Sequence, residues 1–135
     1  MFLLDTVVLS ELRKRRPSAQ LLGWLGRQSD GDLFLSVVTL GEIERGIEKQ
    51  RKLNPEFAAE LTRWLAATQT LYADRILPVS APIARRWGAL SAQLGYDGAD
   101  LLIAATAITH GLTVVTRNVK HFTPNGVKVL NPFES

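Results

Sequence analysis

Short apolar runs recur along the chain and alternate with longer segments in which apolar residues return every three or four positions. The first run, Phe2-Leu3-Leu4, stops at the carboxylate of Asp5. Runs of this length, bounded by polar residues, predict short buried strands. Four further strands are predicted in the same way, at residues 33–36, 76–79, 112–116 and 127–130.

Six segments between or beside these strands have the spacing of helices. Three carry end signals: Asn54 followed by Pro55 opens the longest helix, and Gly95 and Gly111 close two others. The last helix, around residues 101–108, is apolar on nearly every side and is therefore expected to be buried. The apolar stripes of the other five are Val8, Leu9 and Leu12; Ala19, Leu21, Leu22 and Leu25; Ile43 and Ile47; Phe57, Leu61, Trp64, Leu65, Thr68, Leu71 and Tyr72; and Ile83, Trp87, Leu90 and Leu94.

Strands that alternate with helices, without the turn signals of hairpins, predict a parallel sheet that is buried on both faces. We therefore expect a single α/β domain over residues 1–135, with a central, mostly parallel five-stranded sheet and helices on both faces. The length of the chain and its hydrophobic content of 46% suit one such domain.

Composition excludes several classes of protein. No apolar run approaches the roughly 18 residues of a membrane span, and Asp5 interrupts the first run too early for a signal peptide. We therefore expect a cytoplasmic protein with no membrane contact. The absence of cysteine excludes disulfides, thiolate zinc sites and cysteine nucleophiles. A net charge of +3 permits a polyanionic partner without requiring one.

Acidic and polar residues stand where strands give way to helices or where helices begin: Asp5, Glu42, Asp100 and the turn Thr116-Arg117-Asn118. In open parallel sheets, ligands bind at the carboxyl ends of the strands. Three carboxylates gathered there would repel each other unless a cation joined them. Oxygen ligands suit Mg²⁺ or Mn²⁺, and such a site supports metal-assisted cleavage of a phosphodiester.

Each acid also has a purely structural explanation. Thr39 with Glu42, and Asp97 with Asp100, have the spacing of a capping box, in which the second residue bonds back to the first turn of the helix. The helix dipole favours acids there in any case. For one acid alone the structural explanation is favoured, and it is the coincidence of three that adds weight to the functional one.

Basic residues gather at 13–16 and again at Arg45, Lys49, Arg51 and Lys52. They form either a solvated face or a rim that follows the phosphates of a nucleic acid. His121 lies close to the expected crevice, either as a surface residue or as an aid to proton transfer.

Several blocks of the sequence together resemble one family, the PIN-domain ribonucleases of the VapC toxin type, in the branch that includes FitB-like proteins. The blocks follow the family order along nearly the whole chain. They are Leu3-Leu4-Asp5-Thr6 with Leu9-Ser10-Glu11-Leu12, Thr39-Leu40-Gly41-Glu42-Ile43 with Gly46-Ile47, Asp100-Leu101-Leu102-Ile103-Ala104-Ala105-Thr106-Ala107, Thr116-Arg117-Asn118-Val119-Lys120-His121-Phe122, and Gly126-Val127 with Asn131-Pro132-Phe133.

The resemblance implies a Mg²⁺- or Mn²⁺-dependent endoribonuclease that acts on RNA as the toxin of a type II toxin–antitoxin system. It further implies a homodimer and a hetero-oligomer with a VapB-type antitoxin, whose tail offers a guanidinium to the acidic pocket. Carried over by position, Asp5 and Asp100 bind the metal, and Glu42 completes the site through a water bound to the metal. Asn118 is the fourth residue of the catalytic set. Two hydroxyls, Thr6 and Thr116, support the site.

Two positions depart from the family pattern: Val7 replaces a usual asparagine, and His121 stands where aspartate often precedes Phe122. Both departures remove polar or acidic groups, so a non-catalytic PIN-like module that binds RNA or protein is the alternative. A phosphatase of the haloacid dehalogenase type is a more distant one, because it needs a second aspartate where Val7 stands.

Overall fold

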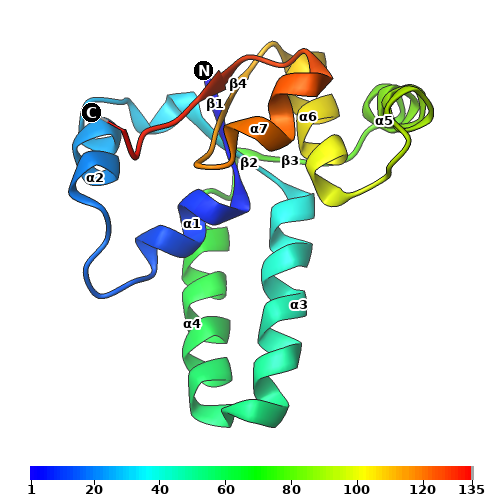
Figure 1. The fold of residues 1–135 in the computed structure, drawn as a ribbon. Helices are drawn as coiled ribbons and strands as arrows, with labels where there is room; N and C mark the ends of the chain where they lie inside the picture. Colours follow the sequence, from blue (N-terminus) through cyan, green and yellow to red (C-terminus); the bar gives the residue numbers. More distant parts are fainter. Residues whose placement is uncertain (135) are drawn as a thin grey trace.

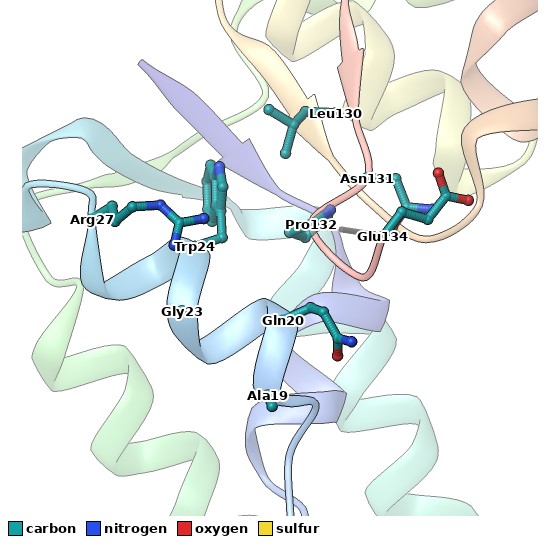
Figure 2. Close-up of a pocket in the computed structure, with 9 residues that line it drawn as sticks. All are labelled: Ala19, Gln20, Gly23, Trp24, Arg27, Leu130, Asn131, Pro132 and Glu134. Atoms are coloured by element: carbon teal, nitrogen blue, oxygen red, sulfur yellow. The ribbon is translucent and has the colours of Figure 1, made fainter.

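Five parallel strands form the centre of the computed structural model, which describes residues 1–134 (Figure 1). The strands are β1 (Phe2–Leu4), β2 (Leu33–Ser36), β3 (Ile76–Leu77), β4 (Thr113–Val115) and β5 (Val129–Leu130). Their order in the sheet is β3-β2-β1-β4-β5, and every neighbouring pair is parallel. The first strand of the chain therefore lies in the middle of the sheet, between β2 and β4.

Helices follow the strands, as the alternating pattern predicts. Within residues 1–134 they are α1 (Thr6–Leu12), α2 (Ala19–Gly26), α3 (Val37–Leu53), α4 (Pro55–Leu71), α5 (Ala81–Leu94), α6 (Ala99–His110) and α7 (Val119–Phe122). In Figure 1, α3 and α4 form a long antiparallel hairpin that extends away from the sheet, and α5 lies at the right of the view, beside α6.

The two faces of the sheet are covered by separate apolar clusters, because successive side chains of a strand point to opposite faces. Leu3 packs with Ile103 and Phe122 on the face of α6 and α7. Leu4 packs on the other face, in a cluster that includes Val8 of α1 and further residues of α2, α3 and α4. Both faces are therefore buried, and the expected sheet with helices on both sides is confirmed.

Local signals set several helix ends. The side chain of Asn54 caps α4 by accepting a hydrogen bond of 3.2 Å from the backbone nitrogen of Phe57. Gly95 and Gly111, with φ of 79° and 68°, end α5 and α6 in the left-handed conformation that glycine tolerates best. These three end signals are confirmed.

Other boundaries differ from the prediction. The third helix begins at Val37, before Thr39, because Ser36 caps it. Strand β3 ends at Leu77 instead of residue 79, since β2 has already given way to α3 and offers no further partner. The short helix α7 lies where the apolar pattern predicts no element. Among residues 1–134, no helix is both long enough and apolar enough to cross a membrane.

Truncation of the central strand should test this packing. Leu4 is fully buried and Leu53 is 79% exposed. We predict that Leu4→Ala lowers the free energy of unfolding by about 2–5 kcal/mol, because it removes buried methyl groups and leaves a cavity. The matched change Leu53→Ala should alter it by less than about 0.5 kcal/mol. Urea denaturation measures both, and equal losses would contradict the description of the core.

Candidate active site

The topology brings the ends of β1, β2 and β4 to one edge of the sheet. Asp5 follows β1 directly, and Thr116 follows β4. Glu42 lies in α3, which starts where β2 ends, and Asp100 lies in the first turn of α6. The carboxyl edge of the sheet is where open α/β folds bind ligands. The expected meeting of Asp5 with Glu42 and Asp100 is supported by the effect of their negative charges on Asp5.

Asp5 is the most enclosed of the acids, with 5% of its surface exposed. Its Oδ1 accepts a hydrogen bond of 2.9 Å from the backbone nitrogen of Thr6, which makes Asp5 the cap of α1. Its Oδ2 accepts one of 2.8 Å from the hydroxyl of Thr116. The pKa of Asp5 is nevertheless raised to about 6, mostly by burial and to a smaller extent by the negative charges of Asp100 and Glu42.

Glu42 is held by hydroxyl groups. The hydroxyl of Thr6 donates to Oε1 of Glu42 at 2.6 Å, and its oxygen lies 3.2 Å from the hydroxyl oxygen of Thr39. The capping box predicted for Thr39 and Glu42 is wrong, because Ser36 caps α3 and Thr39 is a buried residue of its first turn. The carboxylate of Glu42 therefore bonds across to α1 instead of back to its own helix.

Asp100 does not belong to a capping box either. The cap position of α6 is Gly98, so the predicted role of Asp97 as the cap is wrong. Oδ2 of Asp100 lies 3.1 Å from Nδ1 of His121, and the side chain of Asp100 is 34% exposed. The carboxylate is thus positioned from α7 and stays accessible to a ligand.

Asn118 reaches the site through its backbone. It is exposed, and its backbone nitrogen donates a hydrogen bond of 3.0 Å to the hydroxyl oxygen of Thr116. The hydroxyl of Thr116 therefore connects Asn118 to Asp5. Val7 packs against the apolar cluster of α1 to α4. The valine that replaces the family's usual asparagine therefore contributes to the core and makes no polar contact with the site.

Comparison with known proteins identifies the fold and the family. Residues 2–123 match the family model of the PIN domain. The chain belongs to the PIN-domain family.

Its relatives place it among toxin proteins of that family. It is 33% identical to the VapC ribonuclease Y4jK of Sinorhizobium fredii over 149 residues, covering 99% of each chain. It is 32% identical to the toxin FitB of Neisseria gonorrhoeae over 144 residues, covering 98% of this chain and 99% of FitB. The resemblance to the VapC type and its FitB-like branch is confirmed.

Solved structures agree. The crystal structure of FitAcB from Neisseria gonorrhoeae superposes with a TM-score of 0.87 at 34% identity and covers 100% of both chains. A toxin–antitoxin complex from Klebsiella pneumoniae superposes with a TM-score of 0.71 at 26% identity, also over 100% of both chains. The PIN fold thus accounts for the whole chain.

The donors at the sheet edge fit a hard cation held by few protein ligands. Among residues 1–134, no three His, Asp or Glu side chains form a complete cation-binding cluster by themselves. Mg²⁺ does not need one, because it retains several waters and is usually held by one or two carboxylates. Asp5 and Asp100 supply such carboxylates. A shared cation would also offset the repulsion that raises the pKa of Asp5.

Pattern analysis missed one buried acid next to the site. Glu11 is 6% exposed, and its Oε2 accepts a hydrogen bond of 2.9 Å from the backbone nitrogen of Ser18. Its Oε1 lies 2.9 Å from Nζ of Lys14 and 3.3 Å from the guanidinium of Arg117. The signal that could have found it is an acid on an apolar stripe, with a lysine three residues later.

A groove leads away from the acids between α1, α3 and α4. It has a volume of about 220 Å³ and begins at Thr6 and Glu42. Apolar residues line its far end, among them Phe57, Leu61 and Trp64. The groove therefore joins a negatively charged end to an apolar one.

The buried carboxylate of Asp5 should destabilise the metal-free protein at neutral pH. Its pKa is near 3.9 in an unfolded chain and about 6 in the folded protein, so the folded state binds the proton more tightly. Stability is therefore lost as pH rises from about 4 to 6, by roughly 3 kcal/mol at most. Asparagine resembles the protonated carboxyl and does not ionise.

We predict that Asp5→Asn is more stable than the wild type by about 1–3 kcal/mol at pH 7.5 in EDTA, and that this gain shrinks toward zero near pH 4. Urea denaturation at both pH values measures the difference. A gain that does not change with pH would show that Asp5 does not titrate in this window.

Proposed function

We propose that this PIN-domain protein is an endoribonuclease that depends on Mg²⁺ or Mn²⁺ and acts in the cytoplasm as the toxin of a toxin–antitoxin pair. The observation that carries the proposal is the burial of the Asp5 carboxylate close to Asp100 and Glu42: burial raises the pKa of Asp5 most, the two negative charges add to the effect, and together they bring it to about 6. A relative over the full chain is named a VapC ribonuclease, in agreement with this chemistry. The homodimer implied by the resemblance stays a prediction.

Each residue has a defined task in hydrolysis. A divalent cation at this site would supply an activated water and neutralise charge on the phosphodiester. Asp5 and Asp100 would hold the cation. Thr116 fixes Oδ2 of Asp5, and Thr6 fixes Oε1 of Glu42, so both carboxylates are oriented before the substrate binds. Glu42 would orient the attacking water and accept its proton, and Asn118 would complete the edge of the site.

Asp100 and Asp97 lie near the start of the same helix, α6, so the same substitution at the two positions gives a test and its control. We predict that Asp100→Asn lowers metal-dependent RNA cleavage by about 100-fold or more, because it removes a charged metal ligand. Asp97 is exposed and lies three residues earlier, so Asp97→Asn should cleave like the wild type. Single-turnover cleavage of labelled RNA in Mn²⁺ measures both, and circular dichroism verifies the fold.

The same assay addresses the non-catalytic alternative. The departures from the family pattern at Val7 and His121 favour that alternative. If the wild type binds RNA but does not cleave it in Mg²⁺ or Mn²⁺, the protein is a binding module. Equal cleavage by Asp100→Asn and the wild type would contradict the assigned site.

We further propose that the antitoxin occupies the groove that starts at Glu42. A segment rich in arginine and apolar residues fits its two ends, because a guanidinium pairs with carboxylates while apolar side chains pack on Phe57, Leu61 and Trp64. The similar fold in a toxin–antitoxin complex from Klebsiella pneumoniae supports a partner of this kind.

Two leucines of α4 test this groove. Leu61 lines it, whereas Leu71 is 68% exposed and lies ten residues further along the same helix. We predict that Leu61→Ala weakens binding of the antitoxin encoded beside the toxin by about tenfold, the loss expected for a buried apolar contact. Leu71→Ala should bind normally. Calorimetric titration measures both affinities, and equal affinities would place the antitoxin elsewhere.

A further inference from the structure

We propose that a pocket next to the carboxylates binds a backbone phosphate of the RNA, adjacent to the phosphate that is cleaved. This inference rests on the proposed function and names a substrate subsite for it. Residues 117–121 line the pocket together with Asn131 and Glu134, and its volume is about 300 Å³. Two of its side chains are cationic at neutral pH, those of Arg117 and Lys120.

The pocket borders the candidate active site. His121 lines it and also lies 3.1 Å from Oδ2 of Asp100. Asn118 lines it and is bonded through the hydroxyl of Thr116 to Asp5. The groove that we assign to the antitoxin leaves the site from Thr6 and Glu42 instead. An RNA strand that crosses the carboxylates therefore meets the pocket on the side of α7.

Arg117 is held in place before any ligand arrives. Its guanidinium carbon lies 3.9 Å from the centre of the Phe133 ring, and one of its terminal nitrogens lies 3.3 Å from Oε1 of Glu11. Glu11 is itself fixed by Ser18 and Lys14. The side chain of Arg117 nevertheless stays 46% exposed.

A guanidinium is a planar donor of several hydrogen bonds and matches the geometry of a phosphate. A side chain that is already ordered loses less entropy on binding. The buried Glu11 has no role in the proposed hydrolysis. In the subsite, it holds the guanidinium of Arg117 in position for the phosphate.

The basic residues at the end of α3 are badly placed for the same role. Lys52 lies ten residues after Glu42, which is about 15 Å along a helix. Figure 1 shows that this end of α3 is the tip of the hairpin, away from the sheet. Lys120, by contrast, is two residues from Asn118 and lines the pocket itself. The charge nearest to the scissile phosphate on this side is therefore that of Arg117 and Lys120.

One acid, Glu134, also lines the pocket and is exposed. Its negative charge opposes a phosphate, so its removal should strengthen RNA binding. The proposal therefore predicts weaker RNA binding when a cation of the pocket is removed and stronger RNA binding when the charge of Glu134 is removed. Lys128 offers a matched control for Lys120: both are exposed, but Lys128 precedes β5 and so lies toward the amino edge of the sheet.

The experiment measures binding of a fluorescently labelled single-stranded RNA by anisotropy, in EDTA so that nothing is cleaved. We expect Lys120→Ala to weaken binding by about five- to tenfold and to reduce the slope of log affinity against log salt by about 0.7. Glu134→Gln should strengthen binding, and Lys128→Ala should leave it unchanged. Arg117→Lys keeps the charge but loses the planar donor, so it should weaken binding while leaving the fold intact.

The outcomes separate this inference from the proposed function. If the wild type cleaves RNA but Lys120→Ala, Arg117→Lys and Lys128→Ala all bind like it, the subsite is wrong and the nuclease stands. If the wild type binds RNA without cleaving it and Lys120→Ala alone weakens binding, the subsite stands and the nuclease fails. If the wild type neither binds RNA in EDTA nor cleaves it in Mg²⁺ or Mn²⁺, both are overturned.

Discussion

The structure depends on one costly interaction, the burial of the Asp5 carboxylate within reach of two other acids. A buried carboxylate resists ionisation, and neighbouring negative charges add to the effect, which is why the pKa of Asp5 rises to about 6. Two hydrogen bonds, from the Thr6 backbone and the Thr116 hydroxyl, offset only part of this cost. A divalent cation shared with Asp100 would offset the rest, so the arrangement favours a metal centre.

The fold makes this burial possible. β1 is the middle strand, and its side chains alternate between two apolar clusters, with Leu3 on one face and Leu4 on the other. The strand is fixed on both sides immediately before Asp5. The carboxylate therefore has little freedom to move away from its neighbours. The groove toward α4 and the pocket beside α7 open on different sides of this fixed point, which gives a partner and a substrate separate approaches.

Much of this architecture could be predicted from the sequence, because the deciding signals are local. Apolar runs mark all five strands, and Asn54, Gly95 and Gly111 mark helix ends that the structure confirms. The meeting of Asp5 with the other acids follows from parallel topology alone. Even so, the family resemblance was needed to choose between a metal site and acids at helix starts.

Some features could not be predicted because they depend on contacts between elements that are far apart in the sequence. Thr39 and Glu42 have the spacing of a capping box, but Ser36 starts the helix earlier and Thr6 of α1 takes the carboxylate. The role of Glu11 requires Arg117, which is 106 residues away. Local pattern supplies no information on such pairs.

The claim that these acids form a cation site is tested most directly by the thermal stability of the protein in Mn²⁺. A ligand that binds only the folded state raises the melting temperature, and the stabilisation grows with the logarithm of the ligand concentration divided by its Kd. The account predicts that saturating Mn²⁺ at pH 7.5 raises the melting temperature of the wild type by several degrees, and that Asp100→Asn loses this rise while Asp97→Asn keeps it. An unchanged melting temperature in the wild type, or an equal rise in Asp100→Asn, would contradict it.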